Sequence, residues 1–180
     1  RDGVKLSQSD ALGTAILLYI AGLDTVVNTL CWQFRHLAST PADQQKLRDN
    51  PQAISKAVEE LLRAYSIVTV TRIVTEDLEF EGMPMKKGDV ISIPTPLCSR
   101  DPDEFENADV VDLERGASRH FAFGFGPHIC LGMHLARVEM NVAIEQWLAR
   151  VPEFRIKEGA RITAHGGAVL SIDTLPLVWS

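Results

Sequence analysis

The sequence predicts a mainly α-helical protein with small β-sheets. Two long segments, residues 7–40 and 131–150, carry apolar residues at helical spacing, and a run of β-branched residues lies between them at positions 67–74. The chain has 180 residues, of which 46% are hydrophobic. That length and composition suffice for one domain with a sizeable core.

Charge and cysteine content argue against a nucleic-acid-binding protein and against a disulfide-rich secreted protein. The net charge of −6 gives no support for nucleic-acid binding. The cysteines, Cys31, Cys98 and Cys130, are odd in number and widely spaced, so we expect reduced thiols in a cytoplasmic protein and no disulfide framework. No secretory leader pattern stands at the start. The chain opens with Arg1 and without Met, which favours an entry into a larger protein; a processed or tagged terminus is the alternative.

The first long helix is expected from about Ser7 to Thr40. Ser7, followed by Asp10 three residues later, resembles a capping box. Apolar residues then occupy nearly every side of residues 11–23. A membrane span needs roughly 20 apolar residues, and Asp10 and Asp24 bracket a shorter run. We therefore expect no membrane span, but a helix buried inside a larger globular protein.

Shorter elements follow in order. Pro41 begins a second helix through about Arg48, and Pro51 begins a third through about Tyr65. Residues 67–74 read as a strand. Residues 78–93 alternate around two glycine turns and read as short strands.

The C-terminal third contains an irregular region, a glycine-rich loop, a helix and a tail. Residues 99–119 are polar and irregular. The helix over about 131–150 is expected to turn Leu135, Val138, Val142 and Trp147 inward. Residues 154–179 read as paired strands around Gly159 and Gly166-Gly167.

The loop over residues 123–132, Phe-Gly-Phe-Gly-Pro-His-Ile-Cys-Leu-Gly, carries the densest chemical signal. Cys130 stands at the N-terminal end of the last long helix, where free N–H groups and the helix dipole favour a thiolate. The glycines allow a close approach of backbone to a flat ligand. Phe123 and Phe125 would shield the sulfur from water. A shielded thiolate is the axial ligand that oxygen-activating haem enzymes require.

Three other interpretations of Cys130 remain open from the residues alone. A lone buried cysteine is usually a small hydrophobic residue. His120, His128, Cys130 and His134 are close enough in sequence for a zinc site, but paired Cys-x-x-Cys ligands are missing. A Cys–His nucleophile is the third interpretation, and it lacks an identifiable orienting partner.

The pattern Phe123-x-x-Gly126-x-His128-x-Cys130-x-Gly132 resembles the haem-binding signature of the cytochrome P450 family. Most of that family has Arg at the position of His128, whereas the bacterial camphor-hydroxylase type has His. The resemblance implies that Cys130 binds the iron of haem b, and that the other signature residues contact the haem. It also implies the C-terminal portion of that fold: long central helix, Glu-x-x-Arg helix, cysteine loop and final long helix.

Glu60 and Arg63 resemble the family's Glu-x-x-Arg motif. At this spacing the two side chains share a helix face, although a solvated pair is the alternative for an isolated match. In the family the pair is buried and joined by a downstream arginine, and Arg115 stands at the corresponding place. The common proline near it is absent. The resemblance gives the three residues a structural role.

Ala21-Gly22-Leu23-Asp24-Thr25 resembles the family's oxygen-binding kink. An aspartate in so apolar a helix is costly unless it is hydrogen-bonded or functional. The alternative is that Asp24 caps a second helix that starts near Thr25. The resemblance implies that Asp24 and Thr25 form an acid–alcohol pair that delivers protons during oxygen activation.

The resemblance also predicts haem and substrate contacts. Arg72 and His128 would bind haem propionates, because a buried carboxylate needs charged donors; an exposed strand cation is the alternative for Arg72. Val68, Val70 and Val169 correspond to pocket positions, or are plain core. Val70 stands where the camphor enzyme has an aspartate, which changes the polarity expected near the haem.

Together these matches imply a monooxygenase that hydroxylates a small hydrophobic, terpenoid-like substrate with dioxygen. Two electrons would come from a ferredoxin-type partner with a separate reductase. The resemblance, which includes the ending 175–179, spans the whole chain but only about the C-terminal half of a family member. Residues 1–180 are therefore expected to be the haem-binding portion of a larger domain, with the other half as another chain or absent.

Two rival functions remain at this point. One is a haem-thiolate peroxygenase, against which the Asp24-Thr25 pair argues, because such enzymes generally lack it. The other is a haem-binding or inactive fragment, whose exposed apolar helix faces would promote self-association.

Overall fold

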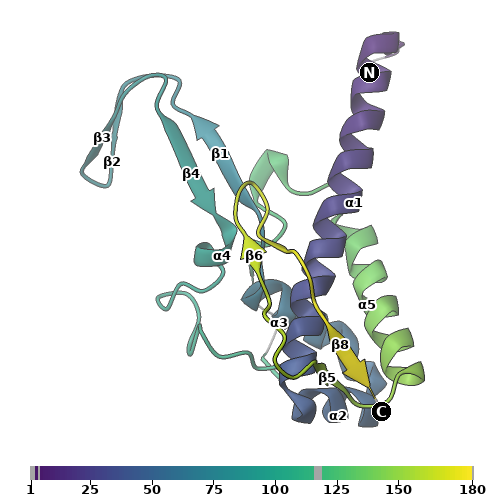
Figure 1. Ribbon diagram of the computed structural model, residues 1–180. Helices are drawn as coiled ribbons and strands as arrows, with labels where there is room; N and C mark the ends of the chain where they lie inside the picture. The colour runs from purple at the N-terminus through teal and green to yellow at the C-terminus, as the bar shows by residue number, and fades with distance from the viewer. Residues whose placement is uncertain (1–2, 4, 116–118, 180) are drawn as a thin grey trace.

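The computed structural model describes residues 3, 5–115 and 119–179. Arg1 and Asp2, where the sequence predicts that the chain enters from a larger protein, lie outside the described residues. Helix α1 (Gln8–Ser39) runs the length of the molecule, and α5 (Met133–Arg150) lies alongside its C-terminal half. Figure 1 shows α2 (Pro41–Asp49) and α3 (Ile54–Ala64) at one end, with the strands of residues 69–94 to one side of α1. The predicted class, mainly α with small β-sheets, is confirmed.

Helix α1 begins where its cap was predicted. The Ser7 hydroxyl accepts a hydrogen bond from the Asp10 N–H (3.1 Å) and donates one to the Asp10 carboxylate (2.6 Å). The helix then continues through Asp24 and Thr25 without a break. The alternative in which Asp24 caps a second helix is therefore wrong.

The core lies where the C-terminal half of α1 meets α2, α3 and α5. Leu37, Leu61, Ile144 and Phe154 are fully buried there. The Gln44 amide, also buried, donates to the carbonyl oxygens of Leu37 (2.8 Å) and Phe154 (2.7 Å). This side chain thus joins α1 to the C-terminal strands. We call this packed region the base.

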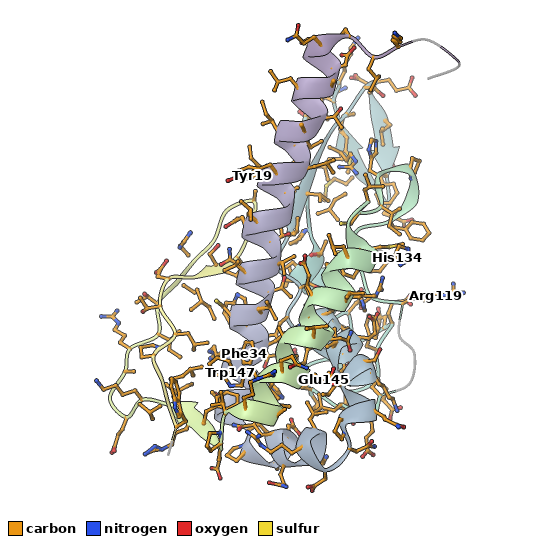
Figure 2. All side chains as sticks on the ribbon, turned by 90° about the vertical axis from the view of Figure 1, so that its right-hand side faces the viewer. Tyr19, Phe34, Arg119, His134, Glu145 and Trp147 are labelled. Atoms are coloured by element: carbon orange, nitrogen blue, oxygen red, sulfur yellow. The ribbon has the colours of Figure 1, made fainter. Side chains whose placement is uncertain are left out.

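Helix α5 buries a different face from the one predicted. Its buried residues are Ala136, Met140, Ile144 and Leu148. Leu135, Val138 and Val142, expected to point inward, are exposed; Trp147 packs against the core as expected. The apolar residues of α5 lie on several sides of the helix, so their spacing in the sequence is compatible with burial of either of two faces. Phe34 of α1 meets Trp147, with ring centroids 5.2 Å apart (Figure 2).

Each sheet is a pair of antiparallel strands. Strand β1 (Thr69–Ile73) pairs with β4 (Val90–Pro94), and β2 (Leu78–Phe80) pairs with β3 (Met83–Met85). The tail forms β5 (Phe154–Ile156) with β8 (Leu177–Trp179), and β6 (Ala164–His165) with β7 (Ser171–Ile172), which confirms the predicted paired strands. The short elements are η1 (Pro51–Ala53), α4 (Thr95–Cys98) and η2 (Gly126–His128).

The N-terminal half of α1 is exposed. Its residues from Gln8 to Asp24 are open to solvent, and Figure 2 shows Tyr19 projecting away from the other elements. By length and hydropathy α1 could also cross a membrane, a test that core helices of soluble proteins pass as well. We call this half of α1, together with the cysteine loop at residues 123–132, the open end. Among the described residues, other elements pack only against the C-terminal half of α1, so the helix extends well beyond them.

Candidate functional site

The cysteine loop is closed by a backbone hydrogen bond between its ends. The Cys130 N–H donates to the Phe123 carbonyl oxygen at 2.9 Å. Gly124 and Gly126 adopt φ angles of 70° and 74°, in the left-handed region that disfavours other residues. The backbone path of the loop therefore favours glycine at positions 124 and 126.

Cys130 is a free cysteine with an exposed side chain. It lies just before Gly132, which caps α5. A Cβ atom at Gly132 would come within 3.9 Å of the Cys130 Sγ, an ordinary contact distance. Apolar side chains that flank the sulfur along the chain, Ile129 and Leu131, are exposed as well. An accessible sulfur on a fixed loop with apolar neighbours fits a haem ligand.

Two of the other interpretations of Cys130, the buried structural thiol and the zinc site, do not fit the structure. Its exposure does not fit a buried structural thiol. Among the described residues, no group of three or more His, Cys, Asp and Glu side chains could hold a metal ion. His120, one of the possible zinc ligands, is instead hydrogen-bonded to Glu59 at 3.2 Å.

The predicted Glu60–Arg63–Arg115 triad is assembled in the base. Arg63 donates twice to the Glu60 carboxylate, each time at 2.8 Å, and Arg115 Nε lies 3.1 Å from Glu60 Oε2. Arg63 and Glu60 are 0% and 2% exposed. Burial raises the pKa of Glu60, but hydrogen bonds from Arg63, the Asp112 N–H and Arg115, with the Arg63 charge, lower it overall.

The triad also organises the irregular segment after α4. Arg63 donates to the carbonyl oxygens of Ser99 (3.0 Å), Ala108 (2.8 Å) and Val110 (3.0 Å). These bonds satisfy a buried guanidinium while holding a segment that forms no helix or sheet. The role expected from the resemblance, structural support, is what these contacts provide.

A second network, which the sequence reasoning missed, lies one residue away. Arg137 of α5 donates to both carboxylate oxygens of Glu59, at 2.6 and 2.9 Å. Its guanidinium lies over the Phe123 ring, 4.6 Å from the centroid. We call Glu59, His120, Phe123 and Arg137 the α3–α5 clamp. The signal that could have revealed it is a second acid beside Glu60 and a basic residue two turns beyond Cys130.

Asp24 and Thr25 lie on the open half of α1. Thr25 Oγ1 donates to the Ala21 carbonyl oxygen at 2.7 Å, a local bond of the kind expected. The buried Asn28 amide donates to both the Asp24 carbonyl oxygen (2.9 Å) and Asp24 Oδ1 (3.0 Å). Asn28, which the sequence reasoning did not select, therefore fixes the direction of the Asp24 carboxylate.

The remaining predicted residues lie on the strands and the cysteine loop. Arg72 is exposed on β1 opposite Ile91, and its guanidinium donates to the Thr71 carbonyl oxygen. His128 is exposed at the end of η2. Within the part of the chain that the structure describes, neither is bonded to a carboxylate, so both are free to bind one.

The predicted pocket valines are partly brought together. Val68 and Val169 form an isolated β-bridge, while Val70 pairs with Ile93 across β1 and β4. All three are half-buried. Residues far apart in sequence thus meet near one end of β1.

Comparison with known proteins gives consistent similarities. The cytochrome P450 family profile matches residues 1–161. A probable cytochrome P450 127A1 from Sinorhizobium fredii is 44% identical over 99% of this chain and 43% of its own length. A biotin biosynthesis cytochrome P450 from Bacillus subtilis is 38% identical over 88% of this chain and 40% of its own length.

Solved structures agree. The crystal structure of CYP101J2 superposes with a TM-score of 0.94 at 38% identity, and cytochrome P450 CYP101C1 with 0.96 at 36%. Each covers 99% of this chain, which in turn spans 45% and 46% of those chains. This chain therefore spans less than half the length of the relatives that it matches.

Proposed function

The chain belongs to the cytochrome P450 family, and from that premise we propose that it provides the thiolate side of a haem monooxygenase. The family resemblance inferred from the cysteine loop is confirmed, and the family implies a haem cofactor. The observation that carries the proposal is the accessible Cys130 sulfur on a loop closed by the Cys130–Phe123 hydrogen bond. We propose haem b as the form bound.

The proposed haem contacts come from the loop and from β1. Cys130 would hold the haem iron through its sulfur, and the N–H groups at the start of α5 would stabilise the negative charge of the thiolate. Gly126 and Gly132 would leave room for the macrocycle, and Phe123 would limit access of water to the sulfur once the haem is bound. Arg72 and His128 would bind the propionates; their freedom from carboxylates within the described residues supports this role.

When bound, the haem supplies oxygen activation and insertion of one oxygen atom into a C–H bond. The chain's own residues manage the protons. Asp24 would transfer protons through its carboxylate, whose Oδ1 accepts a hydrogen bond from the Asn28 amide at 3.0 Å. Thr25 Oγ1, whose hydroxyl donates to the Ala21 carbonyl oxygen, would relay protons next to Asp24. These roles rest on the adjacent positions of the exposed Asp24 and the half-buried Thr25 on α1.

We propose a small hydrophobic, terpenoid-like substrate, two electrons from a ferredoxin-type donor with a separate reductase, and a cytoplasmic location. The half-buried valines Val68, Val70 and Val169 support an apolar pocket. One relative is named for biotin biosynthesis, so family membership alone does not determine the substrate.

We propose that residues 1–180 form one portion of a larger haem domain, which a further segment or chain completes. The exposed apolar half of α1 and the exposed α5 residues Leu135, Val138 and Val142 support this arrangement. Without that covering the isolated chain would bind haem weakly and self-associate.

Thiolate ligation is tested by the absorption spectrum of the reduced, carbon monoxide-treated protein. We expect the long-wavelength Soret band of thiolate ligation in the parent and in Cys98→Ser, the matched control. In Cys130→Ser that band should be lost. A spectrum unchanged by Cys130→Ser, or failure of the complete protein to bind haem, would overturn the proposal.

A peroxide-supported assay without a reductant separates the monooxygenase from the rival peroxygenase. The hydrogen bonds of Asp24 with Asn28 and of Thr25 with Ala21 favour the monooxygenase. Proton delivery during oxygen activation needs an ordered acid and an ordered alcohol. We expect Thr25→Ala to divert electrons to peroxide without weakening haem binding. Full turnover with peroxide alone, unaffected by Asp24→Asn or Thr25→Ala, would favour the peroxygenase.

A further inference from the structure

The α3–α5 clamp joins elements on both sides of the cysteine loop. Glu59 lies on α3 and Arg137 on α5, and their side chains meet in a two-bond ion pair. Bidentate arginine–carboxylate pairs fix geometry as well as charge. Both side chains are about one-third exposed, so they lie at the edge of the core and not within it.

His120 completes the clamp on the N-terminal side of the loop. Its Nδ1 accepts a hydrogen bond from the Ala122 N–H (3.3 Å), so its Nε2 carries the proton that is donated to Glu59 (3.2 Å). Burial raises the pKa of Glu59, but the bonds from His120 and Arg137 outweigh it and lower the pKa to about 2. Glu59 is therefore a carboxylate at neutral pH.

The clamp reaches the sulfur ligand through Phe123. The Arg137 guanidinium covers the Phe123 ring at 4.6 Å, and the His120 ring lies 5.9 Å from it. The Phe123 carbonyl in turn accepts the Cys130 N–H. A shift of Phe123 would thus move the bond that closes the loop.

We propose that Glu59 and Arg137 are positioning residues for Cys130: together they hold Phe123 and the loop, and their paired charges set the electrostatic field at the sulfur. This inference rests on the proposed thiolate function and deepens it. The hydrogen bond that Arg137 donates to Glu59 raises the pKa of Arg137, burial lowers it, and the charges of Glu59 and Cys130 raise it further, so Arg137 remains cationic.

The positioning role is tested by amide hydrogen exchange of the complete protein in its haem-free form. We expect Arg137→Gln, which removes both the ion pair and the cation–π contact, to speed exchange over residues 121–130 by about tenfold. Glu59→Gln, which removes only the ion pair, should speed it by about threefold. Exchange in α2 should not change. Asp77→Asn, which breaks the exposed Asp77–Lys86 pair, is the matched control and should leave the loop unaffected.

The electrostatic role is tested by the reduction potential of the haem-loaded protein. Glu59→Gln leaves the Arg137 charge uncompensated, which favours the reduced state and raises the potential. Arg137→Gln removes a positive charge and lowers it. Both variants break the same ion pair, so a merely structural role predicts shifts of the same sign, whereas the proposal requires opposite signs.

The outcomes distinguish the positioning role of the α3–α5 clamp from the thiolate function of Cys130. Unchanged exchange in the loop, or equal acceleration throughout the chain, overturns the positioning role. Same-sign potential shifts overturn the electrostatic role. If the parent protein binds no haem, the thiolate function fails, while the exchange measurement still decides whether the clamp positions the loop.

Discussion

The base and the open end of the molecule contrast in how their polar groups are satisfied. In the base, Arg63 and Glu60 are buried and every bond from Arg63 ends on a protein acceptor. At the open end, Cys130, His128 and Asp24 are exposed, and apolar side chains of α1 face solvent. The difference shows that the base is held by contacts within the chain, and it supports the proposal that haem and a further segment cover the open end.

The largest expected effect comes from breaking the triad in the base. Arg63→Ala leaves the Glu60 carboxylate buried without its main partner, and should lower the free energy of unfolding by about 3–5 kcal/mol. Chemical denaturation of the complete protein measures this. The control is Arg150→Ala, an exposed residue at the end of α5, for which little change is expected. A comparable loss of unfolding free energy in both variants would contradict the contrast between the buried triad and the exposed polar residues.

The next effect separates the two faces of α5. Ile144→Ala removes a fully buried side chain and should cost about 2–4 kcal/mol. Val142→Ala removes an exposed one and should cost less than about 1 kcal/mol in the isolated chain. If a further segment covers α5, the Val142 value should rise in the complete protein, which sharpens the comparison. Equal values in the isolated chain would mean that the buried face is wrongly assigned.

A smaller effect concerns pH at the α3–α5 clamp. The pKa of Glu59 is lowered from 4.5 to about 2, so its contribution to stability is fully present above pH 4.5 and is lost as pH falls toward 2. Because the pair is partly exposed, we expect less than about 1 kcal/mol. Unfolding measured against pH should show a shallower acid slope in Glu59→Gln than in the parent. Identical slopes would mean that the pair adds nothing.

The smallest effect on stability, and a clear effect on association, is expected at the open end. Leu17→Gln replaces an exposed side chain on α1 and should change the free energy of unfolding by no more than about 0.5 kcal/mol. The isolated chain should nevertheless self-associate less, as measured by sedimentation. Unaltered association would show that this half of α1 is not the surface responsible.

The sequence predicted the base better than the clamp for physical reasons. Glu60 and Arg63 are three residues apart on one helix, so local geometry brings them together. Glu59 and Arg137 are 78 residues apart, and nothing in the spacing of surface charges reveals such a pair. Helix boundaries followed from Ser7 and the prolines, because caps act locally.

The buried face of α5 could not be predicted in the same way. Its apolar residues lie on more than one side, so the choice between the Val142 face and the Ile144 face depends on which neighbour packs there. The cysteine loop was predicted through its glycines, since Gly124 and Gly126 adopt backbone angles that few other residues tolerate. The partner of Asp24, Asn28, was missed because an i, i+4 amide is common in helices.

The placement of the tryptophans has a spectroscopic consequence. All three lie in or against the base: Trp32 donates to the Leu170 carbonyl oxygen, and Trp147 lies 6.1 Å from Trp179 between ring centroids. Their intrinsic emission will therefore report the melting of the base, while Tyr19 is the aromatic residue that reports from the exposed half of α1. A fluorescence melt excited at the indole band can show a sharp transition while the cysteine loop has already lost its order unseen.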